Sequence, residues 1–251
     1  MFTAPCQLLE WDSSFFGFRV ARINGDSLTP ELTREIDRYC VENYIDCLYF
    51  LARSDDSCTT SLAEDAGFNL VDVRMELIHG GAHSLNVWGD DVVQPVLLRE
   101  ARSRDIGRLR IIAGRSYRET RFFYDNHFPR HLSVLLYQEW ISRSFEGYAD
   151  QVLIAEADQE PVGYITCHLD ESTGVGTIGL FGVDEEMRGR GIGKALVNGA
   201  LDWFASRQFD KIRVITQGRN LAAQRLYQRC GFLTESVHLW YHKWYDTRYG
   251  E

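Results

Sequence analysis

The segment Arg188-Gly189-Arg190-Gly191-Ile192-Gly193-Lys194 constrains the fold of this chain more than any other, because it joins an extended apolar run to an amphipathic helix. Residues 177–183 have the pattern of a strand, and residues 191–205 place their apolar side chains along one helical stripe. The alternate glycines remove Cβ atoms that would block a ligand. The N–H groups and the dipole at the helix start attract an anion. The sequence therefore predicts a phosphate-binding turn.

Two well-known glycine motifs do not fit this turn. A dinucleotide-binding fingerprint that begins at Gly189 needs glycine at position 194, where the chain has Lys194. A P-loop that ends in Gly193-Lys194 needs glycine at position 188 and a hydroxyl residue at position 195, where the chain has Arg188 and Ala195. The pattern that remains is Arg188-x-x-Gly191-x-Gly193.

The elements around the turn predict an α/β fold with a mixed sheet. A strand at 96–99 and a helix precede three strands at 151–157, 162–169 and 177–183, which form an antiparallel meander. After the helix at 191–205 come a strand at 211–216, a helix that Asn220 caps and Gly231 ends, and a last strand at 237–245.

The first half of the chain contains a fainter copy of this ending. A helix opened by Thr29-Pro30, a strand at 47–51, a short helix ended by Gly67 and a strand at 70–77 follow in the same order. An offset of 164 residues places Gly67 on Gly231. We therefore predict a diverged internal repeat, with an N-terminal half at 1–95, a linker at 79–95 and a second domain at 96–251.

Composition excludes several classes of protein. With 27 Lys+Arg against 36 Asp+Glu, the net charge is −9, which disfavours binding to nucleic acid. No run of about 18 apolar residues and no signal peptide is present, so we expect a cytoplasmic protein without a membrane contact. The six cysteines show neither C-x-x-C nor metal-ligand spacing with histidine, so we expect free thiols and no metal site.

The turn, together with the block Asn220-Leu221-Ala222-Ala223-Gln224-Arg225-Leu226-Tyr227-Gln228-Arg229-Cys230-Gly231-Phe232, resembles the GNAT superfamily of acyl-CoA-dependent N-acyltransferases over residues 96–245. The resemblance implies a GNAT fold whose N-terminal half is a degenerate copy, and acetyl-CoA or another acyl-CoA as co-substrate. It implies that the turn holds the pyrophosphate, that the preceding strand holds the pantetheine and polarises the thioester through a backbone N–H, and that Asn220 touches coenzyme A. The implied site comprises Phe181, Gly182, Val183, Arg188, Gly189, Arg190, Gly191, Ile192, Gly193, Lys194 and Asn220.

The same resemblance makes Tyr227 the general acid beside the thioester sulfur. A departing thiolate, with a reference pKa of about 8.5, can accept a proton from a phenol of about 10 whose acidity the site adjusts. In the N-terminal copy Ala63 stands at the position of Tyr227, so we expect one active site per chain. The general base stays open, because residues 177–183 contain no acidic side chain. Asp125, His127, His168 and Tyr241 are alternatives.

The acceptor site is expected in the aromatic segment 116–129. Its interleaved rings and polar groups suit a ring-shaped or nucleobase-bearing ligand, and Arg121 could meet a phosphate. A helix pair packed on the sheet would explain the same pattern. The candidate contacts are Arg121, Phe122, Tyr124, Asp125 and His127.

At a narrower level the chain is similar to TDP-fucosamine acetyltransferases and related bacterial enzymes of cell-surface polysaccharide biosynthesis. The matching features are the segment 9–17, Arg121-Phe122 and the late helix with Tyr227. This similarity implies a nucleotide-linked dideoxy-amino sugar as acceptor. An antibiotic, a polyamine or a protein amine is the alternative acceptor, and a non-catalytic acyl-CoA-binding regulatory module is the alternative class. A homodimer is also left open.

Overall fold

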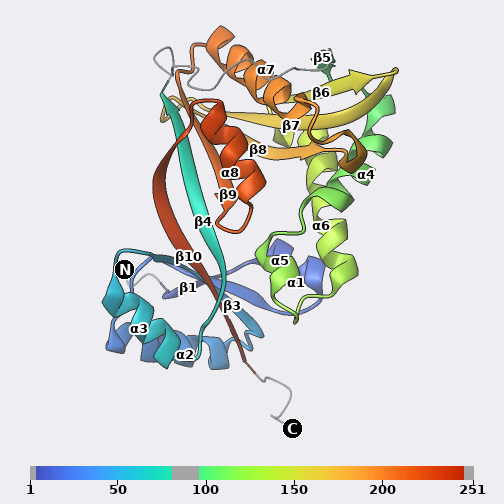
Figure 1. The fold of residues 1–251 in the computed structure, drawn as a ribbon. Coiled ribbons are helices and arrows are strands. Elements are labelled where there is room, and N and C mark those ends of the chain that lie inside the picture. The colour runs from blue at the N-terminus through green and yellow to red at the C-terminus, as the bar shows by residue number, and fades with distance from the viewer. Residues whose placement is uncertain (1–3, 81–95, 246–251) are drawn as a thin grey trace. The chain divides into compact units, whose positions relative to one another are not determined.

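The computed structural model describes residues 4–80 and 96–245 and has a mixed α/β fold, as the sequence predicts. Within these residues ten strands are hydrogen-bonded in the order β1-β2-β3-β10-β4-β9-β8-β7-β6-β5 (Figure 1). The chain divides into two compact units. Unit 1 comprises Met1–Arg74, Arg121–Phe128 and Val237–Glu251, and unit 2 comprises Met75–Thr120 and Pro129–Ser236.

This division into compact units differs in kind from the predicted division at 95/96. Unit 1 takes segments from both halves of the chain, and strands β4 (Asn69–Gly80) and β10 (Leu233–Trp244) each contribute residues to both units. The predicted halves describe a repeat along the sequence and stay a prediction. Most of the predicted linker, residues 81–95, lies outside the described residues.

Unit 2 contains the predicted meander and the helix that follows it. Its further elements are β5 (Leu97–Glu100), η2 (Ser103–Asp105), α4 (Ile106–Ser116), α6 (Arg130–Arg143), η3 (Ser144–Tyr148), β6 (Gln151–Ala157), β7 (Glu160–Asp170), β8 (Val175–Val183), η4 (Glu185–Met187), α7 (Ile192–Ser206), β9 (Lys211–Gln217) and α8 (Leu221–Arg229). Strands β5 to β8 pair antiparallel in succession, and β9 pairs parallel with β8.

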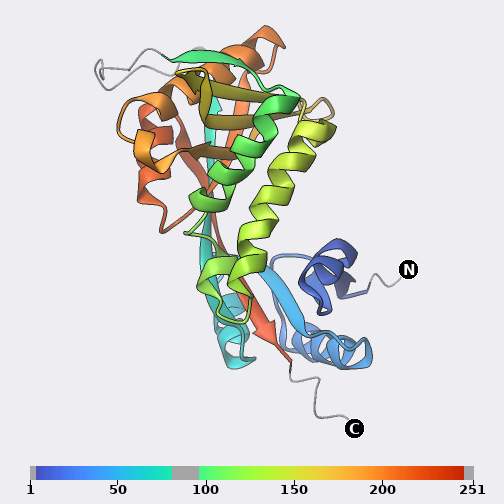
Figure 2. The same cartoon turned by 90° about the vertical axis from the view of Figure 1, so that its right-hand side faces the viewer.

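Two sets of helices cover the strands of unit 2. Helix α7 buries Leu196, Ala200 and Phe204 in a core that also holds Ile165 and Cys167 of β7. Because side chains alternate along a strand, Tyr164 and Thr166 of β7 point to the opposite face. Helices α4 and α6 run side by side (Figure 2), and the Tyr117 ring at the end of α4 stacks on Tyr137 of α6 at 4.2 Å.

Unit 1 is built around a second core. Its further elements are β1 (Cys6–Leu8), α1 (Glu10–Phe16), β2 (Val20–Ile23), α2 (Pro30–Glu42), β3 (Cys47–Arg53), α3 (Ser57–Asp65) and α5 (Arg121–Tyr124). Strand β2 pairs antiparallel with β1 and parallel with β3, and β3 pairs antiparallel with β10. Helices α2 and α3 contribute Ile36, Cys40 and Ala63 to this core (Figure 1).

The element bounds support the internal repeat. Shifted by 164 residues, the first and last residues of β3, α3 and β4 fall on those of β9, α8 and β10. Asp56 caps α3 as Asn220 caps α8, each accepting a backbone N–H three residues on at 3.1 Å. Gly67 and Gly231 end these helices with φ of 79° and 88°, which glycine adopts without strain.

We predict that Gly176→Ala destabilises unit 2, because a Cβ on this residue of β8 would lie 2.6 Å from Phe204 Cδ1 of α7 and 2.9 Å from Ile212 Cδ1. Overpacking of this kind costs about 1–3 kcal/mol in the free energy of unfolding. Gly107→Ala is the matched control. It lies in α4 with no atom within 4 Å of the added Cβ, so the free energy should stay the same or rise by up to about 1 kcal/mol. Chemical denaturation measures both, and equal effects would contradict the packing argument.

Candidate active site

The glycine turn of unit 2 leaves the start of α7 without a side-chain cap. Gly189 and Gly191 have φ of 76° and 80°, in the left-handed region that favours glycine. Gly191 is the N-cap residue of α7 and has no side chain to accept the first-turn N–H groups. These donors are therefore oriented toward whatever lies beyond the helix start, as an anion site requires.

The two arginines of the turn are fastened to the backbone. Arg188 Nε donates to the Val183 carbonyl at 3.4 Å, and Arg190 Nη2 donates to the Glu186 carbonyl at 3.3 Å. Asp184, just before the turn, accepts from Glu186 N and forms an ion pair with Arg108 of α4. The turn thus has a fixed shape and two cations that stay at the surface.

Strand β8 carries a bulge opposite β7 and stops pairing with β9 before the turn. Ile178 is paired with Cys167 of β7 and Phe181 with Ile165, so Gly179 and Leu180 stand opposite one residue, Thr166. The pairing of β8 with β9 runs from Val175↔Lys211 to Ile178↔Val214, although both strands continue further. The backbone after Ile178 is consequently available to partners other than β9.

The Phe181 N–H makes its hydrogen bond to a side chain. It donates to the Tyr117 hydroxyl at 2.9 Å, and this hydroxyl lies 3.0 Å from the hydroxyl of Tyr164. Enclosure by protein raises the pKa of both phenols above the ordinary value. The sequence predicts a role for the backbone of Phe181, but nothing in the sequence links it to Tyr117.

Tyr227 lies in the last turn of α8, with 3% of its surface exposed. Its ring meets Phe181 of β8 edge-on at 6.1 Å and Phe232 at 5.6 Å. Burial raises the pKa of this phenol, and the neighbouring Tyr117 adds to the effect. The fold therefore brings Tyr227, Phe181 and Tyr117 together in unit 2.

Close packing connects α8 to the start of α7. Asn220 accepts the Ala223 N–H at 3.1 Å, so the predicted capping role is confirmed. A Cβ on Gly193 would lie 3.1 Å from Leu226 Cδ2 and 3.3 Å from Phe181 Cζ. Gly193 therefore permits the close approach of α7, α8 and β8 around Tyr227.

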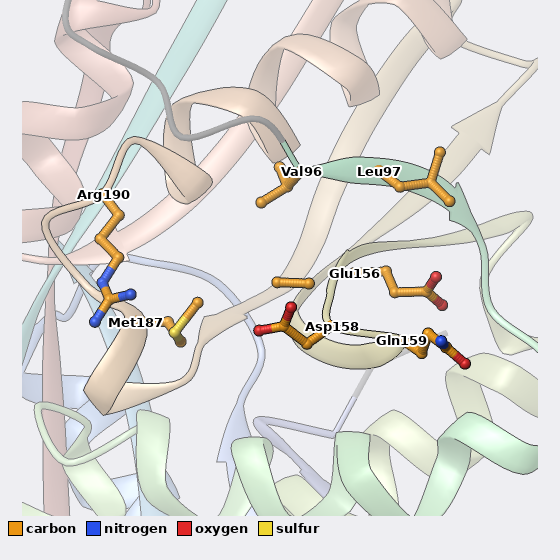
Figure 3. Close-up of a pocket in the computed structure, with 8 residues that line it drawn as sticks. Val96, Leu97, Glu156, Asp158, Gln159, Met187 and Arg190 are labelled. Carbon is orange, nitrogen blue, oxygen red and sulfur yellow. The ribbon is translucent and has the colours of Figure 1, made fainter.

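A cavity of about 400 Å³ lies beside the segment that leads into the glycine turn (Figure 3). Met187 and Arg190 line it together with Val96, Leu97 and the β6–β7 hairpin at 156–159. The lining contains two carboxylates, of which Glu156 is paired with Arg99, and one cation, Arg190. This lining has no excess of positive charge for a phosphate, so the anion site is better matched by the bare start of α7.

In unit 1 the predicted acceptor residues Arg121 and Phe122 are in direct contact, and Asp125 is linked to Arg121 through His242. The Arg121 Cζ lies 4.1 Å from the centre of the Tyr49 ring and 4.3 Å from those of Phe122 and Trp240. Arg121 Nη1 also lies 2.9 Å from His242 Nε2. Cation–π contact on several rings fixes the guanidinium plane.

Asp125 is connected to this cluster by hydrogen bonds. Its Oδ2 accepts from His242 Nδ1 at 2.7 Å and from Trp244 Nε1 at 2.9 Å, and its Oδ1 lies 3.0 Å and 2.8 Å from the backbone and ring nitrogens of His127. Burial opposes ionisation, but these hydrogen bonds outweigh it and hold the pKa of Asp125 below its ordinary range. Asp125 and Phe122 are buried, whereas Tyr124 and the His127 side chain are 58% and 61% exposed.

His242 is fully buried between Arg121 and Asp125 and has to be neutral to bind both. Nε2 accepts from Arg121 while Nδ1–H donates to Asp125. Burial lowers the pKa of His242 to about 4, although the Asp125 contact works in the opposite direction. The sequence analysis missed His242 and Trp240, because β10 carries them to this cluster from more than a hundred residues away.

The remaining candidates for a general base, His168 and Tyr241, belong to different compact units. His168 of β7 is beside Thr166, 3.3 Å from Nε2 to Oγ1, and burial lowers its pKa. Tyr241 is buried in unit 1, with its ring stacked on Phe50 at 6.3 Å, and burial raises its pKa. A neutral imidazole can accept a proton, whereas a phenol of raised pKa cannot do so at neutral pH.

In residues 4–80 and 96–245 no group of three or more His, Cys, Asp or Glu is arranged to hold a metal ion. Over the same ranges, every helix is too short or too polar to cross a bilayer.

The sequence of this chain is similar to a family of known proteins. The model of the acetyltransferase (GNAT) family matches residues 114–232. The chain is 28% identical to dTDP-fucosamine acetyltransferase of Escherichia coli O6:H1 over 96% of its own length and 98% of that enzyme's length. It is 27% identical to the spore coat polysaccharide biosynthesis protein SpsD of Bacillus subtilis over 53% of its own length, and the match spans 45% of that relative.

Among solved structures, a functionally unknown conserved protein from Staphylococcus epidermidis has the same fold. Its TM-score is 0.68 at 15% identity, over 97% of this chain and 92% of that one. At this identity the likeness concerns the fold alone.

We predict that His242 makes the stability of the protein depend on pH between about 6.5 and 4. In this range the unfolded chain binds a proton at the imidazole while the folded chain does not, so the free energy of unfolding rises with pH. The difference in pKa corresponds to at most about 3 kcal/mol. His242→Gln should remove this part of the slope, and His131→Gln, at an exposed position on α6, should retain it. Chemical denaturation at a series of pH values measures the slope. If the free energy of unfolding of His242→Gln depended on pH as that of the parent does, other groups would be responsible for the slope.

Proposed function

We propose that this chain transfers an acetyl group from acetyl-CoA to the amine of a nucleotide-linked dideoxy-amino sugar. The match of residues 114–232 to the acetyltransferase (GNAT) family model supports the reaction. The full-length similarity to dTDP-fucosamine acetyltransferase supports this choice of acceptor. We further propose that residues 96–251 are the catalytic domain and that residues 1–95 are a degenerate copy of it.

The observation that carries the proposal is the convergence of the turn, Phe181 and Tyr227 in unit 2. The uncapped start of α7 and its glycines fit a pyrophosphate, because the donors are oriented and Cβ atoms are absent. Acetyl-CoA would supply the activated thioester. We propose that it is held by Phe181, Gly182, Val183, Arg188, Gly189, Arg190, Gly191, Ile192, Gly193, Lys194 and Asn220.

Tyr227 is proposed as the general acid. The buried phenol stays protonated at neutral pH, since its pKa is raised, and can donate a proton only to a stronger base that forms beside it. A thiolate released next to the ring is such a base while it is desolvated. Direct attack by the amine requires no covalent enzyme intermediate.

The acceptor is proposed to contact Arg121, Phe122, Tyr124, Asp125 and His127. The exposed and the buried residues of this set would act in different ways. Arg121, fixed over three rings, is suited to meet a phosphate oxygen, and the exposed Tyr124 and His127 offer flat surfaces for a ring. The buried Phe122 and Asp125 would act by holding these groups in place.

A place in cell-surface polysaccharide biosynthesis follows from such an acceptor, and the similarity to the Bacillus spore coat polysaccharide biosynthesis protein supports it. The net charge of −9 agrees with a small-molecule partner rather than nucleic acid. We propose a cytoplasmic enzyme that acts without a metal or a membrane contact, as a monomer or homodimer.

Thiol release from acetyl-CoA in the presence of TDP- and UDP-linked amino sugars tests the acceptor. We expect release that depends on the nucleotide sugar. A preference for polyamines, aminoglycosides or peptide amines would overturn the sugar assignment and favour the alternative acceptors. Tight coenzyme A binding without turnover on any amine would favour a regulatory module.

We predict that Arg121→Gln raises the KM for the nucleotide sugar at least about tenfold, because a charge-assisted hydrogen bond to phosphate is lost. The KM for acetyl-CoA should not change. Arg34→Gln is the control, since Arg34 is an exposed arginine of unit 1 paired only with Glu31 among the described residues. Steady-state kinetics with both substrates measure the effect, and an unchanged KM for the sugar would exclude a phosphate contact at Arg121.

We predict that Tyr227→Phe lowers kcat by about 10² or more while leaving coenzyme A affinity within a few-fold, since the ring contacts to Phe181 and Phe232 remain. Tyr148→Phe, at a residue 77% exposed, should behave as the parent. Calorimetry and single-turnover thiol release separate binding from chemistry. If kcat for Tyr227→Phe equalled that of the parent, another group would have to protonate the thiolate.

A further inference from the structure

Two phenols of unit 2, the half-buried Tyr117 and the buried Tyr164, have no place in the site that the sequence predicts. They lie where β8 bulges and parts from β9, at the backbone N–H of Phe181. This N–H belongs to the strand whose backbone, by the family resemblance, is expected to polarise the thioester carbonyl, with Phe181 and Val183 as the alternative positions. In the structure it is engaged with the Tyr117 hydroxyl at 2.9 Å.

Tyr117 is held in this position from three directions. Its ring stacks on Tyr137 of α6, with the centroids 4.2 Å apart and the planes 14° from parallel. Its hydroxyl accepts from Phe181 and lies 3.0 Å from the Tyr164 hydroxyl. Tyr164 is itself completely buried in β7. A side chain fixed by stacking and two hydrogen bonds is preorganised rather than adaptable.

The hydrogens of this group can be counted. Phe181 N–H supplies one hydrogen to Tyr117, and each phenol brings one of its own. The two hydroxyls share one hydrogen bond, which uses one of the two phenolic hydrogens. Among the described residues the other hydrogen has no protein acceptor. A phenol that accepts two hydrogen bonds keeps its own hydrogen for a third partner, which can be water or a bound ligand.

The Phe181 bond also changes what Tyr117 can do. A hydroxyl that accepts hydrogen bonds from an amide and from a second phenol becomes a stronger donor through cooperativity. Tyr117 keeps part of its surface exposed, whereas Tyr164 does not. Since Tyr164 has no exposed surface, the arrangement that leaves the free hydrogen on Tyr117 is the one a ligand can use.

We propose that the Tyr117 hydroxyl, rather than the Phe181 N–H directly, donates the hydrogen bond to the thioester carbonyl oxygen, with Phe181 and Tyr164 as its positioning groups. This proposal rests on acetyl transfer as the function of the site. As the amine nitrogen bonds to the carbonyl carbon, negative charge grows on the carbonyl oxygen and Tyr117 stabilises it. The C–S bond then breaks, its electron pair goes to sulfur, and Tyr227 protonates the thiolate. Water takes the proton that the amine loses and returns one to the Tyr227 phenolate, which restores the phenol.

The opposite reading makes Tyr117 a plug that occupies the Phe181 N–H until acyl-CoA displaces it. The two readings predict opposite signs for Tyr117→Phe, which keeps the ring stacked on Tyr137 and removes only the hydroxyl. A donor to the carbonyl is worth about 10²–10³ in kcat, so we expect a fall of at least tenfold. A plug would give an unchanged or increased kcat.

Tyr164→Phe is the matched control. It removes the hydroxyl that supports Tyr117 and leaves the Phe181 contact and the Tyr117 hydrogen in place, so its kcat should fall less than tenfold. Thermal unfolding confirms that both variants fold. Coenzyme A affinity, which does not involve the carbonyl, should be the same in both variants and in the parent.

A binding measurement makes the test independent of the acceptor. Acetonyl-CoA, a ketone analogue of the thioester that cannot transfer an acyl group, should bind Tyr117→Phe at least threefold more weakly than the parent, relative to coenzyme A. Equal relative affinity would overturn the proposal even if transfer to an amino sugar were observed. Conversely, failure of every amino sugar with this difference intact would overturn only the acceptor assignment.

If Tyr117→Phe did not fold, 3-fluorotyrosine at position 117 would replace it. This residue has nearly the same size and a stronger phenolic donor, so the relative affinity for acetonyl-CoA should rise. A fall or no change would contradict the proposal.

Discussion

The early separation of β8 from β9 is the constraint on which the site in unit 2 depends. Within a sheet, the N–H groups of a strand are consumed by its neighbours, and none is left for chemistry. In this chain the bulge opposite Thr166 and the end of the β9 pairing at Ile178 release the backbone of Phe181. The glycine turn follows a few residues later, so an N–H that binds a side chain instead of β9 and an uncapped helix start occur on one continuous segment.

Burial gives the surrounding phenols one common property. Tyr117, Tyr164 and Tyr227 all have raised pKa values, so each is a neutral hydrogen-bond donor at physiological pH and none is a base. Such a set can stabilise charge on oxygen and return a proton to sulfur. It cannot deprotonate an amine. Residues 177–183 also contain no acidic side chain, so neither the phenols nor this strand supplies a general base.

In unit 1 a neutral histidine mediates between a cation and an anion. His242 accepts from Arg121 and donates to Asp125, so the charges of these two residues influence one another without direct contact. Asp125 has both oxygens filled by donors, and three rings surround Arg121. The orientation of one guanidinium group is therefore determined by residues from three different parts of the chain.

The sequence determined the elements and the local chemistry. Alternating apolar residues, caps such as Asn220 and stops such as Gly231 act over a few residues, so the meander, α7, α8 and the repeat were predictable. The glycine turn was predictable for the same reason, because backbone conformation and helix start are properties of adjacent residues.

Only the tertiary structure decided which side chains meet. Tyr117 and Phe181 are 64 positions apart, and Arg121 and His242 are 121 apart. The contact of each pair depends on strand register, on the bulge in β8 and on helix packing. None of these leaves a signal in a single sequence, since a tyrosine that packs in a core and a tyrosine that binds an amide have the same neighbours along the chain.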